Sequence, residues 1–270
     1  MDNLTLGLII LLVIIVSCRW NWWRLNQKGV AILMYHKIGI PPKSSRLKKL
    51  WVSPQKFARQ MAYLTRHKYS IITMKEFVDN LIGNKSMSDK TVIITFDDGY
   101  KDTYSEAFPV LQRYNFKATI FLSVGYIGGK NQWEDPQEEP LVPMLNWDQI
   151  QQMLEYGMDF GSHTLTHANL LTCQIEPKRL DYELKESKKI LENKLHWPII
   201  SFAYPYGAGA NNWEIKEEVR KAGYIVACGI KQGKFTVPLY DAFNLRRLLV
   251  RGDDNLADFW LNLKTGRARF

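Results

Sequence analysis

The stretch Val92-Ile93-Ile94-Thr95-Phe96-Asp97-Asp98-Gly99 decides how this 270-residue chain is interpreted. Its apolar half is typical of a short buried strand. Side chains alternate faces along a strand, so both carboxylates can enter one cavity only where the strand ends and the backbone turns at Gly99. The Asp-Asp-Gly triplet taken alone also suits a plain turn with local hydrogen bonds.

A second polar cluster, His163-Thr164-Leu165-Thr166-His167, follows the apolar segment Met158–Gly161. Two imidazoles at positions i and i+4 share a face if the segment makes a helical turn, although such a pair is also common in purely structural settings. One carboxylate and two imidazoles make the three-ligand set of a catalytic metal with open positions. The second carboxylate would then be free to move protons, and the cation would keep both ionised.

The third motif is Ser201-Phe202-Ala203-Tyr204-Pro205-Tyr206-Gly207. With it, the chain resembles the polysaccharide deacetylases (the NodB-homology family, carbohydrate esterase family 4) from about residue 30 to about residue 250. The stretch Leu33-Met34-Tyr35-His36 is similar to the start of the branch that acts on poly-N-acetylglucosamine. The resemblance implies a metal-dependent N-deacetylase of an N-acetylglucosamine-containing polysaccharide. The roles it implies are a general base, Asp97; metal ligands, Asp98, His163 and His167; and a backbone oxyanion donor, Tyr206.

The chain departs from the family pattern at the general acid, because no histidine follows His196. Apart from the two expected metal ligands, the chain has three histidines that remain as candidates for the general acid. His67 and His196 belong to the ends of predicted helices and are expected on the surface. His36 closes a strand-like run just as Asp97 does, and functional residues of parallel barrels collect where strands end. We therefore expect His36 to be the general acid, the alternative being a hydrogen-bonded histidine at a strand end.

A second departure concerns the third motif, where many family members carry an arginine and this chain has Ala203. Arg247, on a later strand-like segment, is the hypothetical replacement as partner of Asp97. Trp147 is similar to the family's cleft-lining aromatic residue and is expected to bind substrate. Tyr206 and Trp133 are further candidates for stacking on sugar rings, although aromatic residues are also common in cores.

The rest of the chain alternates short apolar runs with helix-like stretches, which favours βα units and a parallel sheet. The predicted fold is an α/β, distorted (β/α)7-type barrel. Gly128–Pro143, rich in polar residues, reads as a long loop over the cleft. The predicted strands are Val30–Tyr35, Val92–Phe96, Ala118–Leu122, Met158–Gly161, Ile200–Tyr204, Ile225–Ala227 and Leu245–Val250. Helices are predicted to begin near Ser53, Met74, Asp102, Trp147, Glu176, Asn212 and Asp254.

Residues 1–25 are expected to form an N-terminal membrane anchor or signal segment, and residues 26–270 the catalytic domain. Leu4–Val16 is almost wholly apolar, and the tryptophans after it suit a membrane–water interface: Trp20, Trp22 and Trp23. Ile15-Val16-Ser17-Cys18 also resembles a lipoprotein cleavage box. The absence of Lys and Arg before the apolar run argues for a cytoplasmic domain, whereas the family's substrates lie at the cell surface. We favour a membrane-anchored enzyme that faces outward.

The formal net charge is +9, from 36 Lys plus Arg against 27 Asp plus Glu. No nucleic-acid motif accompanies this charge, so we expect association with the membrane or cell envelope and no nucleic acid, the alternative being ordinary solvated surface. Cys173 and Cys228 are expected to be separate thiols. The predicted cofactor is a divalent metal, Zn²⁺ first, with Co²⁺ and Ni²⁺ also suited to this ligand set.

Three other functions compete with deacetylation. A carbohydrate-binding or scaffolding protein on the same fold is consistent with the missing late histidine. A phosphate-ester hydrolase ranks last because the sequence has no phosphate-cradling Gly-rich loop. A glycosidase needs carboxyl groups about 5 Å or more apart across the scissile bond, which the adjacent pair Asp97 and Asp98 is poorly placed to provide.

Overall fold

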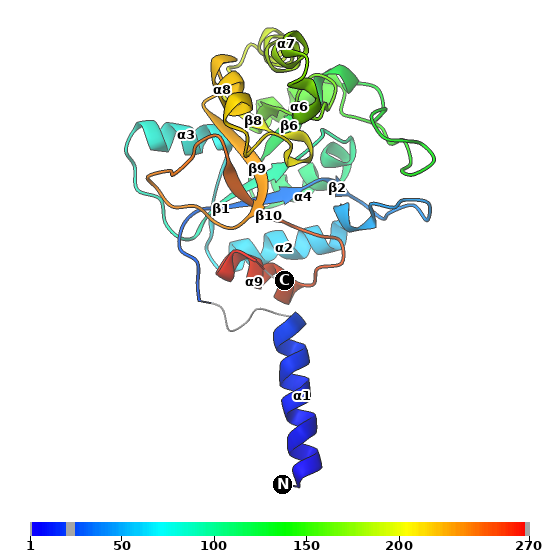
Figure 1. Ribbon diagram of the computed structural model, residues 1–270, viewed down its shortest axis with the longest axis vertical. Coiled ribbons are helices and arrows are strands. Elements are labelled where there is room, and N and C mark those ends of the chain that lie inside the picture. The colour runs from blue at the N-terminus through cyan, green and yellow to red at the C-terminus, as the bar shows by residue number, and fades with distance from the viewer. Residues whose placement is uncertain (1, 20–24, 268–270) are drawn as a thin grey trace.

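A computed structural model describes residues 2–19 and 25–267 of the chain. Within these residues seven parallel strands form a ring, which closes where the first strand pairs with both the last strand and β5 (Figure 1). In chain order these strands are β1 (Ala31–Tyr35), β5 (Thr91–Phe96), β6 (Thr119–Leu122), β7 (Asp159–Ser162), β8 (Ser201–Ala203), β9 (Val226–Gln232) and β10 (Leu245–Leu249). The predicted seven-stranded barrel is confirmed.

The barrel is distorted at β5. On one side β5 pairs along its length with β1, but on the other side it pairs first with β4 (Ser70–Ile72) and then with β6. Sequence analysis missed β4, which is three residues long and not fully buried, so that no apolar run marks it. It also missed a small separate sheet of β2 (Lys37–Ile38) and β3 (Trp51–Val52).

Helices cover the outside of the ring, and their starts agree with the predicted ones except for the short α6, which was not predicted. Side-chain caps explain several of these starts, for instance the reciprocal Thr73–Glu76 and Asn146–Gln149 pairs. The helices are α2 (Pro54–Arg66), α3 (Met74–Ile82), α4 (Phe108–Arg113, preceded by a π-helical turn at Thr103–Ala107), α5 (Trp147–Tyr156), α6 (Leu170–Cys173), α7 (Pro177–Leu195), α8 (Trp213–Lys221) and α9 (Leu256–Thr265). Single 3₁₀ turns lie at Lys48–Leu50, Val124–Tyr126 and Pro205–Gly207.

Two apolar layers hold the barrel together, because alternate residues of each strand face opposite ways. On β5, Ile94 packs in the larger cluster between sheet and helices, whereas Ile93 belongs to a smaller cluster. That smaller cluster joins residues of β1, β6, β8, β9 and β10 and therefore fills the barrel interior. Leu245 of β10 is part of it, so Arg247, two positions later, also points inward.

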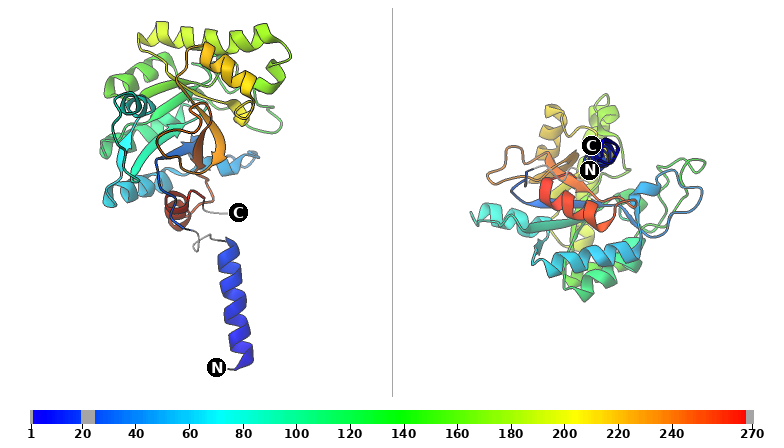
Figure 2. Two further views of the ribbon diagram at one scale, coloured as in Figure 1. Left: turned by 60° about the vertical axis from the view of Figure 1, so that its left-hand side comes forward. Right: turned by 90° about the horizontal axis from the view of Figure 1, so that it is seen from below.

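The N-terminal helix α1 (Asn3–Arg19) projects from the end of the barrel domain where α9 lies, away from α7 (Figures 1 and 2). Its apolar side chains from Leu4 to Ile15 are largely exposed. Over residues 2–19 and 25–267, no helix has both the length and the apolar character needed to traverse a bilayer. Trp20, Trp22 and Trp23 lie outside the described residues, so the membrane segment and the boundary near residue 25 stay predictions.

Candidate active site

The polar residues singled out in the sequence meet where the barrel strands end. Asp97 follows β5, His36 follows β1, His163 follows β7, and Tyr206 lies just past β8. They line a cavity of about 460 Å³. The turn after β5 is possible because Asp98 and Gly99 both take positive φ angles of 73° and 88°. A Cβ on Gly99 would lie 2.8 Å from Leu122 Cδ2, so glycine is required there.

Asp98, His163 and His167 form a buried cluster whose ligand atoms all lie within 4.8 Å of one another. Asp98 Oδ1 is 3.3 Å from His163 Nε2 and 3.1 Å from His167 Nε2. Ligands at 2.0–2.1 Å around a tetrahedral ion are about 3.4 Å apart, so only small adjustments separate these atoms from such a geometry.

The remaining ring nitrogens fix which imidazole atom can bind a cation. His163 Nδ1 is 2.7 Å from the carbonyl oxygen of Ala203, to which it must donate, and His167 Nδ1 is 3.0 Å from the Tyr206 hydroxyl. The Nε2 atoms are therefore left for the cation, as in many metal sites where the outer hydrogen bond sets the tautomer. Burial lowers the pKa of His167 and so favours the neutral, ligating form.

The Asp98 carboxyl group is suited to the same role. Burial alone would raise its pKa, but the close contacts with the imidazoles of His163 and His167 outweigh burial and hold the pKa well below its usual range. The group is therefore ionised at neutral pH. Two neutral imidazoles and one carboxylate fit a divalent transition metal such as Zn²⁺.

The His163–His167 segment makes no helical turn, which was the condition for its i and i+4 spacing to place both imidazoles on one face. The segment is an irregular loop in which Thr164 and His167 have φ angles of 66° and 56°. Glu183 of α7, which is 3 % exposed, shapes this loop because its carboxylate accepts bonds from the backbone N–H groups of Leu165 and Thr166. Glu183 was not predicted, since nothing in the sequence separates it from other acids of that charged helix.

Asp97 and Arg247 form a buried bidentate ion pair. The two guanidinium nitrogens lie 2.6 and 2.8 Å from the two carboxylate oxygens, and Arg247 is fully buried. Arg247 Nε also donates to the carbonyl oxygen of Gly229 at 2.8 Å. Burial raises the pKa of Asp97, but Arg247 outweighs it and the net pKa is lowered. The predicted partnership of Arg247 with Asp97 is thus present in the structure.

His36 lines the same cavity as Asp97 and Asp98. Its Nδ1 atom is buried and has no hydrogen-bond partner among the described residues. Burial lowers the pKa of His36, partly offset by the nearby carboxylates of Asp98 and Asp97. An imidazole with a buried, unpartnered nitrogen beside two carboxylates does not match the alternative of a hydrogen-bonded strand-end histidine.

The aromatic side chains beside the metal cluster include two of the three predicted ones, Trp133 and Tyr206, but not Trp147. Trp133, from the long loop, stacks on His167 with ring centroids 4.5 Å apart, and Tyr206 packs edge-on against the same imidazole at 4.7 Å. Trp147 instead begins α5, packs against the hydrophobic core under Lys194, and is not among the described residues that line the cavity. The position expected for Trp147 is therefore corrected, because its side chain packs against the core at the start of α5.

Tyr206 has φ 59° within the turn after β8, and its side chain is 56 % exposed at the cavity. Its backbone N–H as an oxyanion donor stays a prediction. Several other lining residues were not predicted, among them Tyr100 and Glu134, and Glu134 comes from the long loop. Burial raises the pKa of Glu134, as does the charge of Asp98, while Lys37 opposes this.

Other predictions about reactive side chains agree with the structure. His67 and His196 are exposed at the C-terminal ends of α2 and α7. Cys173 and Cys228 are free and buried. None of these four residues contributes to the cavity that holds Asp97 and Asp98.

Comparisons with known proteins agree with this site. A model of the polysaccharide deacetylase family matches residues 84–227. YxkH of Bacillus subtilis, named as a polysaccharide deacetylase, is 35 % identical over 193 residues, 72 % of this chain and 61 % of its own. This chain therefore spans less than two thirds of that relative. The poly-beta-1,6-N-acetyl-D-glucosamine N-deacetylase of Staphylococcus epidermidis is 30 % identical over 78 % of this chain and 71 % of its own.

Solved structures show the same fold. IcaB of Ammonifex degensii aligns with a TM-score of 0.70 and 26 % identity, covering 89 % of this chain and 97 % of that chain. The Streptococcus pyogenes deacetylase PplD, solved in complex with acetate, gives a TM-score of 0.70 and 26 % identity over 83 % of this chain and 93 % of that one.

Proposed function

Because this chain belongs to the polysaccharide deacetylase family, we propose that it is a metal-dependent enzyme that removes N-acetyl groups from an N-acetylglucosamine polymer. The observation that carries the proposal is the buried Asp98–His163–His167 cluster with the Asp97–Arg247 pair beside it. The name of the Staphylococcus epidermidis relative supports the choice of poly-N-acetylglucosamine.

Asp98, His163 and His167 would hold the metal. A divalent cation supplies Lewis acidity when bound, which polarises a carbonyl group and acidifies water. Asp97 takes the proton as water adds to the amide carbon, and Arg247 keeps its carboxylate ionised and oriented. The Tyr206 N–H is the proposed donor to the developing oxyanion. The C–N bond then breaks, His36 gives a proton to the leaving sugar amine, and acetate remains.

Acetate release tests this proposal. The purified full chain with added Zn²⁺ should release acetate from poly-N-acetylglucosamine or chitooligomers, and a chelator should stop it. Asp97→Asn should abolish release but keep bound metal, whereas Asp98→Asn should lose the metal as well. Asp148→Asn, an exposed change on α5, is the control. Undiminished activity of Asp97→Asn would refute the mechanism.

The same assay separates the competing functions. A carbohydrate-binding or scaffolding protein would bind the polymer but leave its acetyl groups in place. A glycosidase would shorten the chains and keep them acetylated. The intact metal cluster and the ionised Asp97 favour turnover over binding alone.

We also propose that α1 attaches the enzyme to a membrane, with the catalytic domain facing the cell surface where such polymers lie. The exposed apolar side chains of α1 support this proposal. Fractionation of cells should place the full chain with membranes, and protease added to intact cells should digest the domain. A domain protected from protease until the cells are opened would refute the outward orientation.

A further inference from the structure

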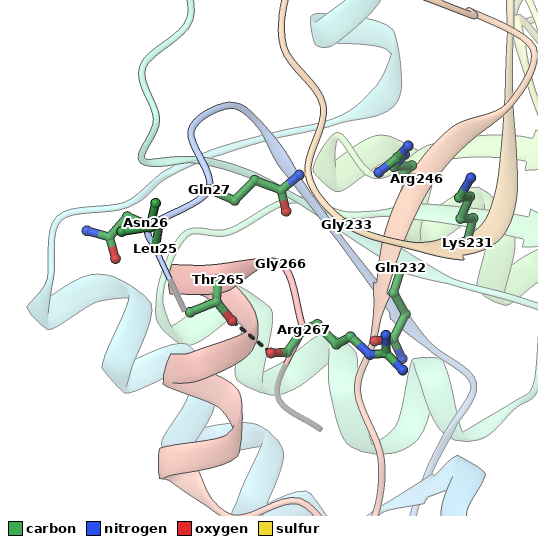
Figure 3. Close-up of a pocket in the computed structure, with 10 residues that line it drawn as sticks. All are labelled: Leu25, Asn26, Gln27, Lys231, Gln232, Gly233, Arg246, Thr265, Gly266 and Arg267. Atoms are coloured by element: carbon green, nitrogen blue, oxygen red, sulfur yellow. Dashed lines mark hydrogen bonds between the residues drawn. The ribbon is translucent and has the colours of Figure 1, made fainter. Parts of the chain in front are cut away.

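A second cavity, of about 1010 Å³, lies on the outside of the barrel beside β9 and β10. Three cationic side chains line it from three segments: Lys231 from β9, Arg246 from β10 and Arg267 from the chain after α9 (Figure 3). No Asp or Glu is among its described lining residues. The cavity is therefore a positively charged hollow that does not use the catalytic groups.

These three cations have no carboxylate partner in the part of the chain that the structure describes. Some other surface cations are paired, as in Lys185–Asp181 and Lys221–Glu218, so what sets these three apart is that they line one hollow without an acid among its described lining residues. Unpaired like charges gathered in one hollow repel one another, and a bound anion removes that repulsion. Arginine and lysine are also the side chains that best recognise phosphate.

One wall of the cavity is formed where the segment around Gln27 packs closely against the chain at Gly266. Gly266 has a φ angle of 74°, a left-handed conformation that favours glycine, and a Cβ there would lie 1.8 Å from Gln27 Oε1. The Gln27 N–H donates to the carbonyl oxygen of Lys264 at 2.9 Å, and its side-chain oxygen accepts from the Lys234 N–H at 3.2 Å. These bonds fix the segment around Gln27 against the cationic rim.

The same bonds place the cavity next to the proposed anchor. Helix α1 ends at Arg19, and Leu25 already lines the cavity. Six residue steps span at most about 20 Å when fully extended. If α1 lies in a bilayer, chain length alone therefore keeps the cavity near the phosphate layer of the same leaflet.

We propose that this cavity binds the phosphate of an anionic phospholipid headgroup. The proposal rests on the proposed membrane attachment for its position and on the three unpaired cations for its chemistry. Gln232 lines both this cavity and the active-site cavity. Headgroup binding would therefore hold the active site beside the membrane surface and set the direction from which a polymer enters.

Hydrogen exchange of the full chain in lipid nanodiscs tests the proposal. We expect slower amide exchange at 25–27, 231–233 and 265–267 in discs that contain phosphatidylglycerol than in pure phosphatidylcholine discs. The variant Lys231→Gln/Arg246→Gln/Arg267→Gln should lose this protection. The control Lys178→Gln/Arg179→Gln/Lys189→Gln removes the same charge from α7 and should keep it.

Each other outcome overturns the proposal. Equal exchange in both kinds of disc, or equal loss in the α7 control, would show that the cavity is not a headgroup site. The same protection by inorganic phosphate in phosphatidylcholine discs would show a small-anion site instead. Binding of the chain to phosphatidylcholine discs measures membrane anchoring by itself, and acetate release measures catalysis. A failure of either one can therefore be distinguished from a failure of the headgroup site.

Discussion

Replacing Arg247 is the sharpest test of how the site works, because this side chain holds the proposed base. Arg247→Met keeps most of the volume but removes the cation and both bonds to Asp97, at 2.6 and 2.8 Å. It leaves a carboxylate in a position that is 2 % exposed. Removing one partner of a buried ion pair costs about 3–5 kcal/mol of folding free energy. We expect a loss of that size for Arg247→Met.

The activity loss follows from the pKa of Asp97. In the folded enzyme Arg247 outweighs the effect of burial and lowers that pKa, and only the ionised carboxylate accepts a proton. Without Arg247 the pKa rises, so the acid limb of the kcat/KM profile should move to higher pH. Because a positioned general base contributes about 10²–10⁴-fold, we expect kcat/KM to fall by roughly 10²-fold near neutral pH.

Three companion variants make the assay decisive. Arg247→Lys keeps the charge but not the two-pronged geometry, so it should restore more stability than activity. Asp97→Asn/Arg247→Met removes both charges and should recover much of the lost stability in urea unfolding. Arg251→Gln, a surface change, should alter neither. If Arg247→Met stays within about threefold of wild-type kcat/KM, with an unmoved acid limb, Arg247 has no positioning role.

Three further predictions follow. Burial raises the pKa of Asp102 in the folded protein to about 7, so the free energy of unfolding of the metal-free protein should fall as pH rises through 7. Urea unfolding at pH 5 and pH 8.5 should show this loss in wild type but not in Asp102→Asn. Lys37→Met breaks the buried bond to Glu139 and should cost about 3–5 kcal/mol in the same measurement; an unchanged unfolding midpoint would contradict this. Trp133→Ala should raise KM about 3–10-fold, while Trp147→Ala should not; the reverse result would restore the sequence-based assignment.

The barrel and the metal cluster could be predicted because their signals are local. Each long buried strand is an apolar run, as at Thr91–Phe96, and its polar residues follow directly at the strand end. The order of such runs with helices between them favours a parallel barrel, in which strand ends meet on one side. Asp98 and the two histidines could therefore be brought together before any coordinates were known.

The residues that position this cluster could not be found in the same way. Glu183 is one acid of a long charged helix, and only the fold turns it toward the His163–His167 loop. Thr164 and His167 adopt a left-handed backbone that is unfavourable for most residues, so the i, i+4 spacing of the two histidines does not reveal the irregular loop that brings them together. Trp133 and Trp147 have no sequence feature that tells a cavity wall from a core contact.

Arg247 explains why this barrel has its active site at one end and an apolar core below it. Its guanidinium carbon lies 5.8 Å from the ring centroid of Phe121, which belongs to the interior apolar cluster. Its nitrogens meanwhile bond Asp97 above and the carbonyl oxygen of Gly229 on the neighbouring strand. A buried cation is tolerated only with such a set of partners. Arg247 therefore lies where the apolar interior of the barrel meets the polar active-site cavity. The ion pair that tunes the base therefore also lies between the apolar cluster inside the barrel and the reactive cavity.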